Sequence, residues 1–470
     1  MISAILFISF FIFLILGVPI GICLGLSSVC AILYSGTSLT IVATNMYSGI
    51  SKFLLLAIPF FVLSGNIMAK AGISKRLIKF VDTCVGHKKG GIAIVCVIVA
   101  CFFGAISGSG PATVAALGAV LIPAMVEQGG FSAPFSTALM ATSSSIAIVI
   151  PPSIAFVVYA SITGTSIADM FMAGIVPGLL MGVALVIVVM LEAKKHNIKP
   201  SREKASGKER WDAFKDAFWG FLMPVIILGG IYGGIFTPTE AAAVSVIYSL
   251  IIVSVVYGLF VGMVIYREVS IRDMFDILVD SAKTTGGIML IVASASLFSF
   301  VCTKFGIADA ASNLLGSIAH NQFTFLLIVN IIFLIAGCFI DANSAMYIFI
   351  PIMLPVCKAL GYDIVAFGVM ATVNLAIGQV TPPVGVNLFV AISIKIKKGL
   401  EVTLQEISRA VVPMIAACVA VLLIVTYIPI TSTFLPKALA KEGSYTGDQS
   451  SASSDTASKD AGDGNNSFDT

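Results

Sequence analysis

Long apolar runs separated by short polar stretches fill most of this chain. A run of about 20 apolar residues can cross a bilayer whose hydrocarbon core is roughly 30 Å thick. By that measure the pattern predicts ten membrane-crossing helices, and the expected fold is an all-α integral membrane protein. The predicted helices cover residues 2–17, 19–35, 53–69, 131–160, 170–191, 217–236, 239–265, 284–302, 362–394 and 410–430.

Two further apolar segments, 91–126 and 322–360, are interrupted near their middle by small and polar residues. The interruptions read GAISGSGPAT, from Gly104 to Thr113, and GCFIDANSA, from Gly337 to Ala345. Each half then holds only about 13–16 residues, which is short for a full crossing. We therefore predict two re-entrant hairpins whose turns stop near the middle of the membrane.

Charge gives the expected orientation. The chain is 58% hydrophobic and only 11% charged, whereas about 25% of residues in soluble domains are charged. The basic loops are 70–89, 192–216 and 395–409, and an excess of Lys and Arg marks the cytoplasmic side. The predicted helices place all three loops on one face. Both termini are then expected on the periplasmic side, and the two hairpins enter the membrane from opposite sides.

The two halves of the chain resemble one another in order, with offsets of about 230–234 residues. An odd number of crossings per half inverts the second half relative to the first. Inverted repeats with helices broken at corresponding positions are typical of secondary transporters, whose substrate binds at the midplane. Ordinary proline kinks and glycine packing sites are the alternative interpretation. The matched pairs are 71–77 with 305–311, 104–125 with 337–356, and 139–153 with 369–385.

These repeats set the expected domain organisation. Residues 1–191 form the first inverted repeat, with hairpin 91–126 and broken helix 131–160. Residues 217–436 form the second, with hairpin 322–360 and broken helix 362–394. A basic cytoplasmic connector, 192–216, joins them, residues 266–283 are expected to form an amphipathic helix at the interface, and the polar tail 437–470 is expected to be disordered.

Each predicted broken helix carries a double proline, in IVIPPS from Ile148 and in QVTPPV from Gln379. Proline removes a backbone donor and frees a carbonyl, which lipid cannot satisfy. Freed carbonyls together with hydroxyl, amide or carboxylate oxygens suit a hard cation such as Na⁺, and helix N-termini attract anions. The polar residues at the breaks and turns are Ser107, Ser109, Thr113, Thr142 to Ser145 and Ser153 in the first half, and Asp341, Asn343, Ser344, Asn374, Gln379 and Thr381 in the second.

Asp341 is the most distinctive of these residues, because an acid within an apolar run is a functional candidate. It could coordinate an ion, or it could cap the helix that starts near Ala342, or do both. No intramembrane Lys or Arg is expected to face the breaks. A bound anion would then have to be held by helix N-termini and hydroxyl groups.

Other classes of protein fit the sequence poorly. The nine cysteines form no CxxC pair, the three histidines lie far apart, and no nucleophile–base or metal constellation is visible. We therefore expect neither an enzyme nor a metal site beyond Na⁺, and no cofactor. No basic face interleaved with aromatic residues predicts binding to nucleic acid.

The motif set resembles the large membrane subunit (M, DctM-like) of TRAP transporters, in the ion-transporter superfamily. The resemblance runs to about Pro436. It rests on GAISGSGPATVAALGAVLIPAM, on IVIPPSIAFVVYASITGTSIADMFMAGIVPG and on NLAIGQVTPPVGVNLFVA. It implies an elevator-type transporter in the bacterial inner membrane, in which hairpins and broken helices move against a scaffold.

The resemblance also implies partners and a coupling ion. A periplasmic solute-binding protein would deliver a carboxylate-bearing solute, a small four-helix Q subunit would brace the large one, and Na⁺ would drive uptake. Because the sequence begins at the first M-type helix, the Q subunit is expected on a separate polypeptide. A stand-alone cation-coupled carboxylate carrier or antiporter that needs no binding protein is the alternative.

The resemblance implies one Na⁺ site between each hairpin turn and the broken helix of the same half. The first-half ion-binding candidates are Ser107, Gly108, Ser109, Thr113, Ser144, Ser145 and Pro151. The second-half candidates are Gly337, Asp341, Asn343, Gly378, Gln379, Thr381 and Pro382. The substrate-binding candidates are Ser109, Ser153, Asn343 and Pro383.

Overall fold

The computed structural model describes residues 1–70, 72–233, 271–318, 321–394 and 402–439. The helix predicted at 239–265 and nearly all of the tail predicted at 437–470 lie outside these residues. Within them, the elements are α-helices and two short 3₁₀ helices, so the all-α prediction is confirmed for the part of the chain that the structure describes.

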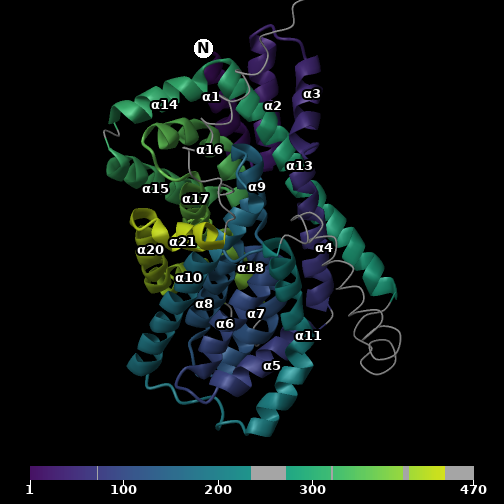
Figure 1. Ribbon diagram of the computed structural model, residues 1–470, viewed down its shortest axis with the longest axis vertical. Coiled ribbons are helices and arrows are strands. Elements are labelled where there is room, and N and C mark those ends of the chain that lie inside the picture. The colour runs from purple at the N-terminus through teal and green to yellow at the C-terminus, as the bar shows by residue number, and fades with distance from the viewer. Residues whose placement is uncertain (71, 234–270, 319–320, 395–401, 440–470) are drawn as a thin grey trace, which may run out of the picture.

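One group of helices is assembled around the long helix α13 (Ile271–Lys304), which runs diagonally across Figure 1. We call α13 and the helices beside it the framework helices. They are α1 (Ile2–Ile15), α2 (Ile20–Tyr34), α3 (Thr40–Ile50) and α4 (Ala57–Lys70), with the short 3₁₀ helix η1 (Phe53–Leu56) between α3 and α4. α13 packs against α2, α3 and α4, and α1 packs against α2.

The second group, which we call the central helices, contains both predicted hairpins and both predicted breaks. Its members pack mainly on one another, and α4 and α13 contact α6 and α16. The central helices are α6 (Gly91–Ser107), α7 (Gly110–Glu127), α8 (Ala133–Ser145), η2 (Ile146–Ile148), α9 (Ile154–Thr163), α10 (Ile167–Lys195), α15 (Gln322–Phe339), α16 (Ala342–Ala359), α17 (Ile364–Gly378), α18 (Val386–Ile392), α19 (Leu404–Ala410), α20 (Val412–Tyr427) and α21 (Ile430–Leu439).

The same succession of elements occurs twice along the chain. α5 (Ile73–Val85) precedes the α6–α7 pair, and α14 (Ile307–Ile318) precedes the α15–α16 pair. An interrupted helix follows each pair, α8 to α9 in one case and α17 to α18 in the other. Gly72 and Gly306, just before α5 and α14, both have a positive φ, of 71° and 64°. Figure 1 shows α5 near the lower end of the molecule and α14 near the upper end.

The prediction of ten spans is not confirmed among the described residues, which do not include the predicted helix 239–265. Among the described residues, five helices are long and apolar enough to cross a membrane, or seven if each of two bent pairs counts as one span. Several predicted crossings are shorter apolar helices, and both double-proline crossings are divided into pieces. The physical reason is that hydropathy follows total apolar length and does not register where the backbone leaves the helix.

The lengths predicted for the hairpin halves are wrong. The arms α6, α7, α15 and α16 contain 17, 18, 18 and 18 residues. At 1.5 Å per residue an arm is about 27 Å long, so length alone does not show that these helices stop in the membrane. The polar residues that seemed to interrupt each arm, such as Ser107 and Ser344, are part of the helices.

Two segments expected outside the membrane helices are structured differently. The loop 70–89 contains α5, whose apolar residues Ile73, Leu77 and Val81 are buried on one face. The separate interfacial helix expected at 266–283 is, from Ile271 onward, the first part of α13. It continues because Ile277 packs into the core, while charged residues on its other faces stay exposed and nothing ends the hydrogen-bond ladder.

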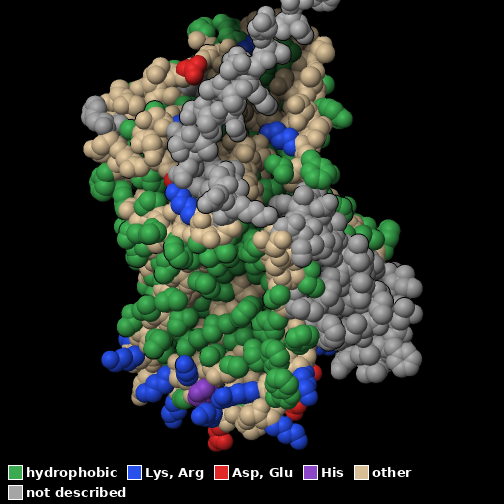
Figure 2. All heavy atoms as spheres, viewed as in Figure 1, with side chains coloured by type: hydrophobic (Ala, Val, Ile, Leu, Met, Phe, Trp, Pro, Cys, Tyr) green, Lys and Arg blue, Asp and Glu red, His purple; other side chains and the backbone are tan. Residues whose placement is uncertain are grey.

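Helix α11 (Gly207–Tyr232) joins the basic connector to the central helices and packs against α5. The guanidinium of Arg202 forms an ion pair with Asp82 at 3.1 Å and another with Glu209. The predicted basic loops 70–89 and 192–216 therefore touch. Figure 2 shows Lys and Arg side chains gathered at the lower end, below a broad apolar band.

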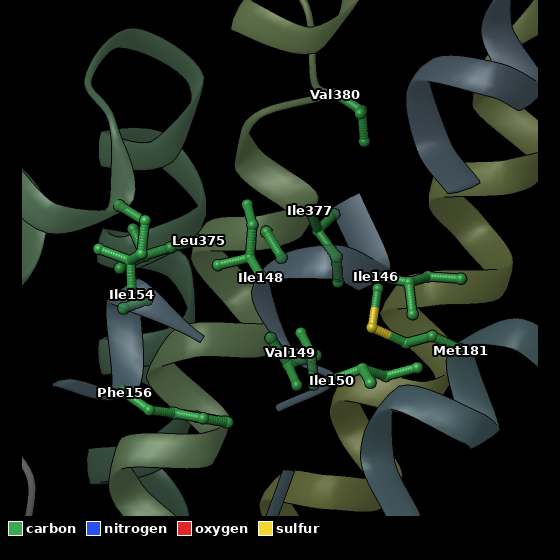
Figure 3. Packing of buried hydrophobic residues seen from close by; sticks show 14 of the residues in the cluster. Ile146, Ile148, Val149, Ile150, Ile154, Phe156, Met181, Leu375, Ile377 and Val380 are labelled. Atoms are coloured by element: carbon green, nitrogen blue, oxygen red, sulfur yellow. The ribbon is translucent and has the colours of Figure 1, made fainter. Parts of the chain in front are cut away.

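The apolar side chains around the two interruptions belong to one hydrophobic core. Figure 3 shows Ile148, Val149 and Ile150, from the first interruption, in one cluster with Ile377 and Val380, from the second. All five side chains are buried. Residues of both interruptions thus reach the packed apolar interior.

Buried hydrogen bonds link the second interrupted helix to its neighbours. The amide nitrogen of Asn374 in α17 donates to Asn330 Oδ1 in α15 at 2.7 Å. Asn330 in turn donates to Thr426 Oγ1 in α20 at 3.1 Å. Hydrogen-bonded amides in a buried position fix neighbouring helices in one register. Asn374, which the sequence offered as a polar residue of the break, is thus engaged in helix packing.

A very close backbone approach joins α15 to α17. A Cβ placed on Gly378 would lie 2.5 Å from the Cα of Gly337. Only two glycines allow helices to approach so closely, so Gly337 and Gly378 have a packing role whatever else they do. These two residues bring the first arm of the α15–α16 pair against the end of α17.

We predict that Gly378→Ala lowers the thermal unfolding midpoint of the detergent-purified protein. The added methyl meets backbone atoms, and overpacking of this kind costs about 1–3 kcal/mol. Gly287→Ala in α13 is the matched control, because nothing lies within 4 Å of a Cβ built there. It should leave the midpoint unchanged or raise it, since alanine favours a helix by about 1 kcal/mol over glycine. Equal midpoints for the two variants would contradict the packing role.

Candidate functional site

The turn between α6 and α7 lies directly against the first double proline. Gly108 ends α6 in the left-handed conformation, with φ 60°. A Cβ on Gly108 would lie 2.7 Å from the carbonyl oxygen of Pro152. Both the backbone angle and the space therefore require glycine. The structure thus brings the predicted turn residue Gly108 beside the residue that follows Pro151.

Three hydroxyl-bearing residues organise this turn. The hydroxyls of Ser107 and Thr113 lie 2.7 Å apart, and Thr113 Oγ1 donates to the carbonyl of Ser109 at 2.8 Å. Ser107 and Thr113 are buried, and Ser109 is partly exposed. The three predicted residues are therefore close neighbours. The hydroxyls of Ser107 and Thr113 meet near the backbone of Ser109, at the start of α7.

A cavity of about 90 Å³ opens beside this turn. Ser107 and Ser109 line it from the central helices, and Gly65, Asn66 and Thr284 line it from the framework helices. Asn66 is fixed by a hydrogen bond from its amide nitrogen to Ser281 Oγ, at 2.8 Å. The cavity thus lies between the two groups of helices, and hydroxyl and amide groups of both line it.

The predicted serines of the first interrupted helix are buried and bonded locally. Ser144 and Ser145 donate to the carbonyls of Ala141 and Thr142, at 2.6 and 2.7 Å. Ser153 begins α9: its hydroxyl accepts from the N–H of Phe156 at 3.3 Å and donates to the carbonyl of Ile148. In this structure, Ser153 therefore satisfies backbone groups that the break frees, the carbonyl of Ile148 among them.

Asp341 begins α16 as its N-cap. Its carboxylate accepts from the N–H groups of Asn343 and Ser344, at 3.0 and 3.2 Å, and from the Ser344 hydroxyl at 2.5 Å. The capping role considered for this residue is therefore present. Neighbouring Asn343 is different, because its Oδ1 is buried and has no hydrogen-bond partner among the described residues.

The second break is more open than the first. Pro151 and Pro152 are buried, whereas Pro382 is partly exposed and Pro383 is exposed. Thr381 Oγ1 donates to the carbonyl of Ile377 at 2.8 Å, which leaves its lone pairs available. The N–H of Gly385 donates to the carbonyl of Cys338 in α15 at 3.3 Å, so the second turn and the second break touch as well.

The structure also joins the first turn to the second break, which the sequence did not predict. A Cβ on Gly110 would lie 2.8 Å from Asn387 Nδ2 and 3.1 Å from Gln379 Oε1. Asn387 is fully buried and Gln379 is 6% exposed. Gln379 Oε1 and both polar atoms of the Asn387 side chain lack partners among the described residues. Unpaired buried polar atoms are costly, so this cluster has the character of a ligand site.

Asn387 is the site residue that sequence reasoning missed. The signal was present, because this asparagine stands within the apolar run that follows the second double proline. The first half has Phe156 at the corresponding position, 231 residues earlier. The two breaks therefore differ in chemistry: polar side chains line the second where apolar ones line the first.

Lys52 also lies in a place that the sequence did not indicate. Helices α3 and α4 with η1 form a bent pair with the length and hydropathy of one span, bent by 62°, and Lys52 stands at the bend. Its ammonium group donates to the carbonyl of Ser161 in α9. A lysine within a candidate span thus contacts the helix after the first break. The expected helix 53–69 started one residue too late to include it.

This chain is similar to known proteins over most of its length. The family described as "Tripartite ATP-independent periplasmic transporter, DctM component" matches residues 7–431. The chain belongs to this family. It is 40% identical to the C4-dicarboxylate TRAP transporter large permease protein DctM of Rhodobacter capsulatus, with 90% of this chain and 96% of that protein covered. The resemblance seen in the sequence motifs is confirmed.

Other members of the DctM family are similar over most of this chain. The sialic acid TRAP transporter large permease protein SiaM of Vibrio cholerae is 34% identical, covering 90% of this chain and 95% of that protein. The isethionate TRAP transporter permease protein DctMQ of Oleidesulfovibrio alaskensis is 41% identical, and the alignment spans 92% of this chain and 66% of that protein. These relatives are named as transport permeases, and the chain, as a member of the DctM family, is a membrane transport protein.

A solved structure supports the fold. The YdaH transporter of Alcanivorax borkumensis superposes with a TM-score of 0.58 at 14% sequence identity, covering 84% of this chain and 89% of that one. At that identity the likeness concerns the fold alone. The chain thus shares its helical fold with that transporter.

We predict that Asp341→Asn and Asp341→Ala separate capping from ion binding. Asparagine can still cap a helix, so Asp341→Asn should keep the unfolding midpoint of the wild type, whereas Asp341→Ala should lose about 1 kcal/mol of stability. If the carboxylate binds a cation, both variants should weaken Na⁺-dependent thermal stabilisation. Asp363→Asn, at a second aspartate N-cap, should leave the Na⁺ response unchanged. An unaltered Na⁺ response in Asp341→Asn would limit Asp341 to capping.

Proposed function

We propose that this chain is the large transport subunit of a tripartite system that imports a carboxylate-bearing solute by Na⁺ symport. The observation that carries the proposal is the cluster at Gly110, Gln379 and Asn387. There, the turn of one half meets the break of the other, and three polar side-chain atoms lack partners among the described residues. A site assembled from two halves can change when the halves move relative to each other.

The proposed ion sites follow the two turns. In the first, the oxygens around Ser107, Ser109 and Thr113 would hold Na⁺ together with carbonyls of the α8–α9 break. In the second, Asn343 Oδ1, Gln379 Oε1 and Thr381 Oγ1 would do so with carbonyls near Gly337 and Pro382. Neutral oxygens of these kinds suit a hard monovalent cation. The support is that Asn343 Oδ1 and Gln379 Oε1 are buried and without partners among the described residues.

The solute would bind between the turns. Ser109 is partly exposed and lines the cavity beside the first turn, and the Asn387 amide can donate to a carboxylate. Ser153, Asn343 and Pro383 complete the proposed substrate contacts. Relatives are named for C4-dicarboxylate and sialic acid, both of which carry carboxylate groups, and this supports a carboxylate-bearing solute.

An elevator-type motion suits this arrangement. The framework helices and the central helices are separate groups, and the cavity at the first turn lies between them. We propose that residues 1–191 and 217–436 are inverted repeats and that the central helices move against the framework. The recurring order of elements, and the placement of α5 and α14 at opposite ends in Figure 1, support this.

The proposed location is the bacterial inner membrane with the basic end in the cytoplasm. The basic loops touch through Arg202 and Asp82, and Figure 1 shows the N-terminus at the end opposite to them. This supports a periplasmic N-terminus. The proposed partners are a periplasmic solute-binding protein and a small Q subunit. The relative named DctMQ exceeds this chain in length, so a joined arrangement of the two membrane subunits is an alternative to separate chains.

Reconstitution tests the function directly. We expect proteoliposomes containing this chain and its Q subunit to accumulate the acid carried by the cognate binding protein only when an inward Na⁺ gradient and that binding protein are both present. Uptake without the binding protein would support a stand-alone carrier. Uptake that is driven equally by a proton gradient or by ATP would contradict Na⁺ symport.

Within that assay we predict that Thr381→Val raises the half-saturating Na⁺ concentration about tenfold or more, because one ion ligand is lost while the side-chain shape is kept. Thr381→Ser should behave nearly as wild type. The matched control is Thr303→Val, since Thr303 Oγ1 donates to its own helix in the same way, to Ser299 O at 3.0 Å, far from the breaks. Identical Na⁺ curves for both valine variants would remove Thr381 from the proposed site.

A further inference from the structure

The neighbouring residues do little to explain the position of the cation Lys52. It stands between α3 and η1, at the bend of a helix pair that has the length and hydropathy of a single span. Lysine within a membrane span is expensive and marks functional positions. Within the described part of the chain, no carboxylate forms an ion pair with it. Packing alone does not account for its charge.

Among the described residues, the hydrogen bond of Lys52 joins the two groups of helices. Lys52 Nζ donates to the carbonyl of Ser161, at a distance of 2.5 Å. Ser161 lies in the last turn of α9, where helix carbonyls are unpaired and carry partial negative charge. The Ser161 hydroxyl is 3.1 Å from the hydroxyl of Tyr347 in α16. Within the part of the chain that the structure describes, this framework ammonium group is held by neutral oxygen alone and keeps further donors available.

The same helix connects Lys52 to the cavity at the first turn. Ile154, at the start of α9, lines that cavity. Ser161 is seven residues further along, about 10 Å at 1.5 Å per residue. The polar side chains among the described residues that line the cavity offer hydroxyl and amide groups, and none of the lining residues described is a cation. If a carboxylate bound in this cavity, the positive charge that balances it would have to come from a residue outside the cavity.

From this arrangement we propose that Lys52 is a solute-binding residue, whose ammonium group exchanges the Ser161 carbonyl for the carboxylate of the solute as it passes between α9 and the framework. This rests on the proposed function. With no solute bound, the Lys52–Ser161 hydrogen bond closes the framework against the end of α9. A carboxylate competes for the ammonium group, because charge-assisted hydrogen bonds are stronger than bonds to a neutral carbonyl.

The test uses the full chain with its Q subunit and binding protein in proteoliposomes. The transported probe is the acid released from the purified cognate binding protein by denaturation and identified by mass spectrometry. For Lys52→Met we expect the maximal rate to fall about tenfold or more. The concentration of loaded binding protein that gives half-maximal rate should stay within about twofold of wild type, since Lys52 acts after delivery.

Lys304→Met is the matched control. Lys304 also belongs to the framework, and its ammonium group also binds a neutral oxygen, Thr37 Oγ1 at 3.3 Å. It should leave both kinetic constants unchanged. Each variant is first compared with wild type by gel filtration and thermal unfolding, so that a folding defect is recognised. If wild type itself takes up no acid, the proposed function fails; normal wild-type uptake with an unaffected Lys52→Met overturns only the role of Lys52.

Chemical rescue separates charge from packing. Lys52 is exposed among the described residues, so Lys52→Cys should react with small thiol reagents. An aminoethyl thiosulfonate, which restores an ammonium group, should recover uptake, whereas a neutral methyl thiosulfonate should not. Wild type treated in the same way controls for the nine native cysteines. Equal recovery by both reagents would overturn the proposal, because it would show that Lys52 only fills space against α9.

Discussion

Backbone groups released in the middle of a packed apolar core must find partners outside their own helix, and this constraint governs the centre of the molecule. The first double proline ends a helix among buried side chains, where no bulk water can satisfy the freed groups, and the second is more exposed. In the first break, Ser153 accepts from one backbone N–H and donates to the carbonyl of Ile148. In the second, Gly385 donates to Cys338 in the neighbouring helix pair. The first break is therefore satisfied within itself, and the second by the neighbouring hairpin.

Small residues make that proximity possible. Gly108 lets the carbonyl of Pro152 approach the first turn, and the Gly337–Gly378 contact brings α15 against α17. At Gly110 the space of a missing side chain is taken by the amide of Asn387. The glycines in the motifs are therefore positions where backbone or polar groups of another element occupy the volume of a Cβ. These glycines contribute to the candidate site indirectly, because they allow polar groups of other elements to come close together.

The two halves share an order of elements but not the same chemistry. The first break is buried, and Ser153 bonds to two of its backbone groups, the N–H of Phe156 and the carbonyl of Ile148. The second break is more exposed, and Gln379 and Asn387 keep buried polar atoms without partners among the described residues. On the proposed function, an ion or solute would gain most at the second break, because polar groups there are left without partners among the described residues.

The sequence by itself determined the class of the protein, most of its helices and the places where two of them break. Hydropathy is local along the chain, and proline and glycine act on their own backbone, so these features can be read without a structure. The same reasoning found the turn residues and the capping acid Asp341. The sequence did not predict the lengths of the hairpin arms. A polar residue such as Ser107 remains helical because a nearby residue, Thr113, provides a hydrogen-bond partner for its hydroxyl.

Only the tertiary structure decided which distant groups meet. Asn387 faces Gly110 across 277 positions of the chain, and Lys52 reaches Ser161 because α3 and α4 bend at that residue. An asparagine in an apolar run and a lysine at the edge of one have several local explanations. Asn387 is distinguished by the lack of a hydrogen-bond partner among the described residues, and Lys52 by its contact with Ser161. Both depend on how distant helices pack, and hydropathy does not show which helices are neighbours.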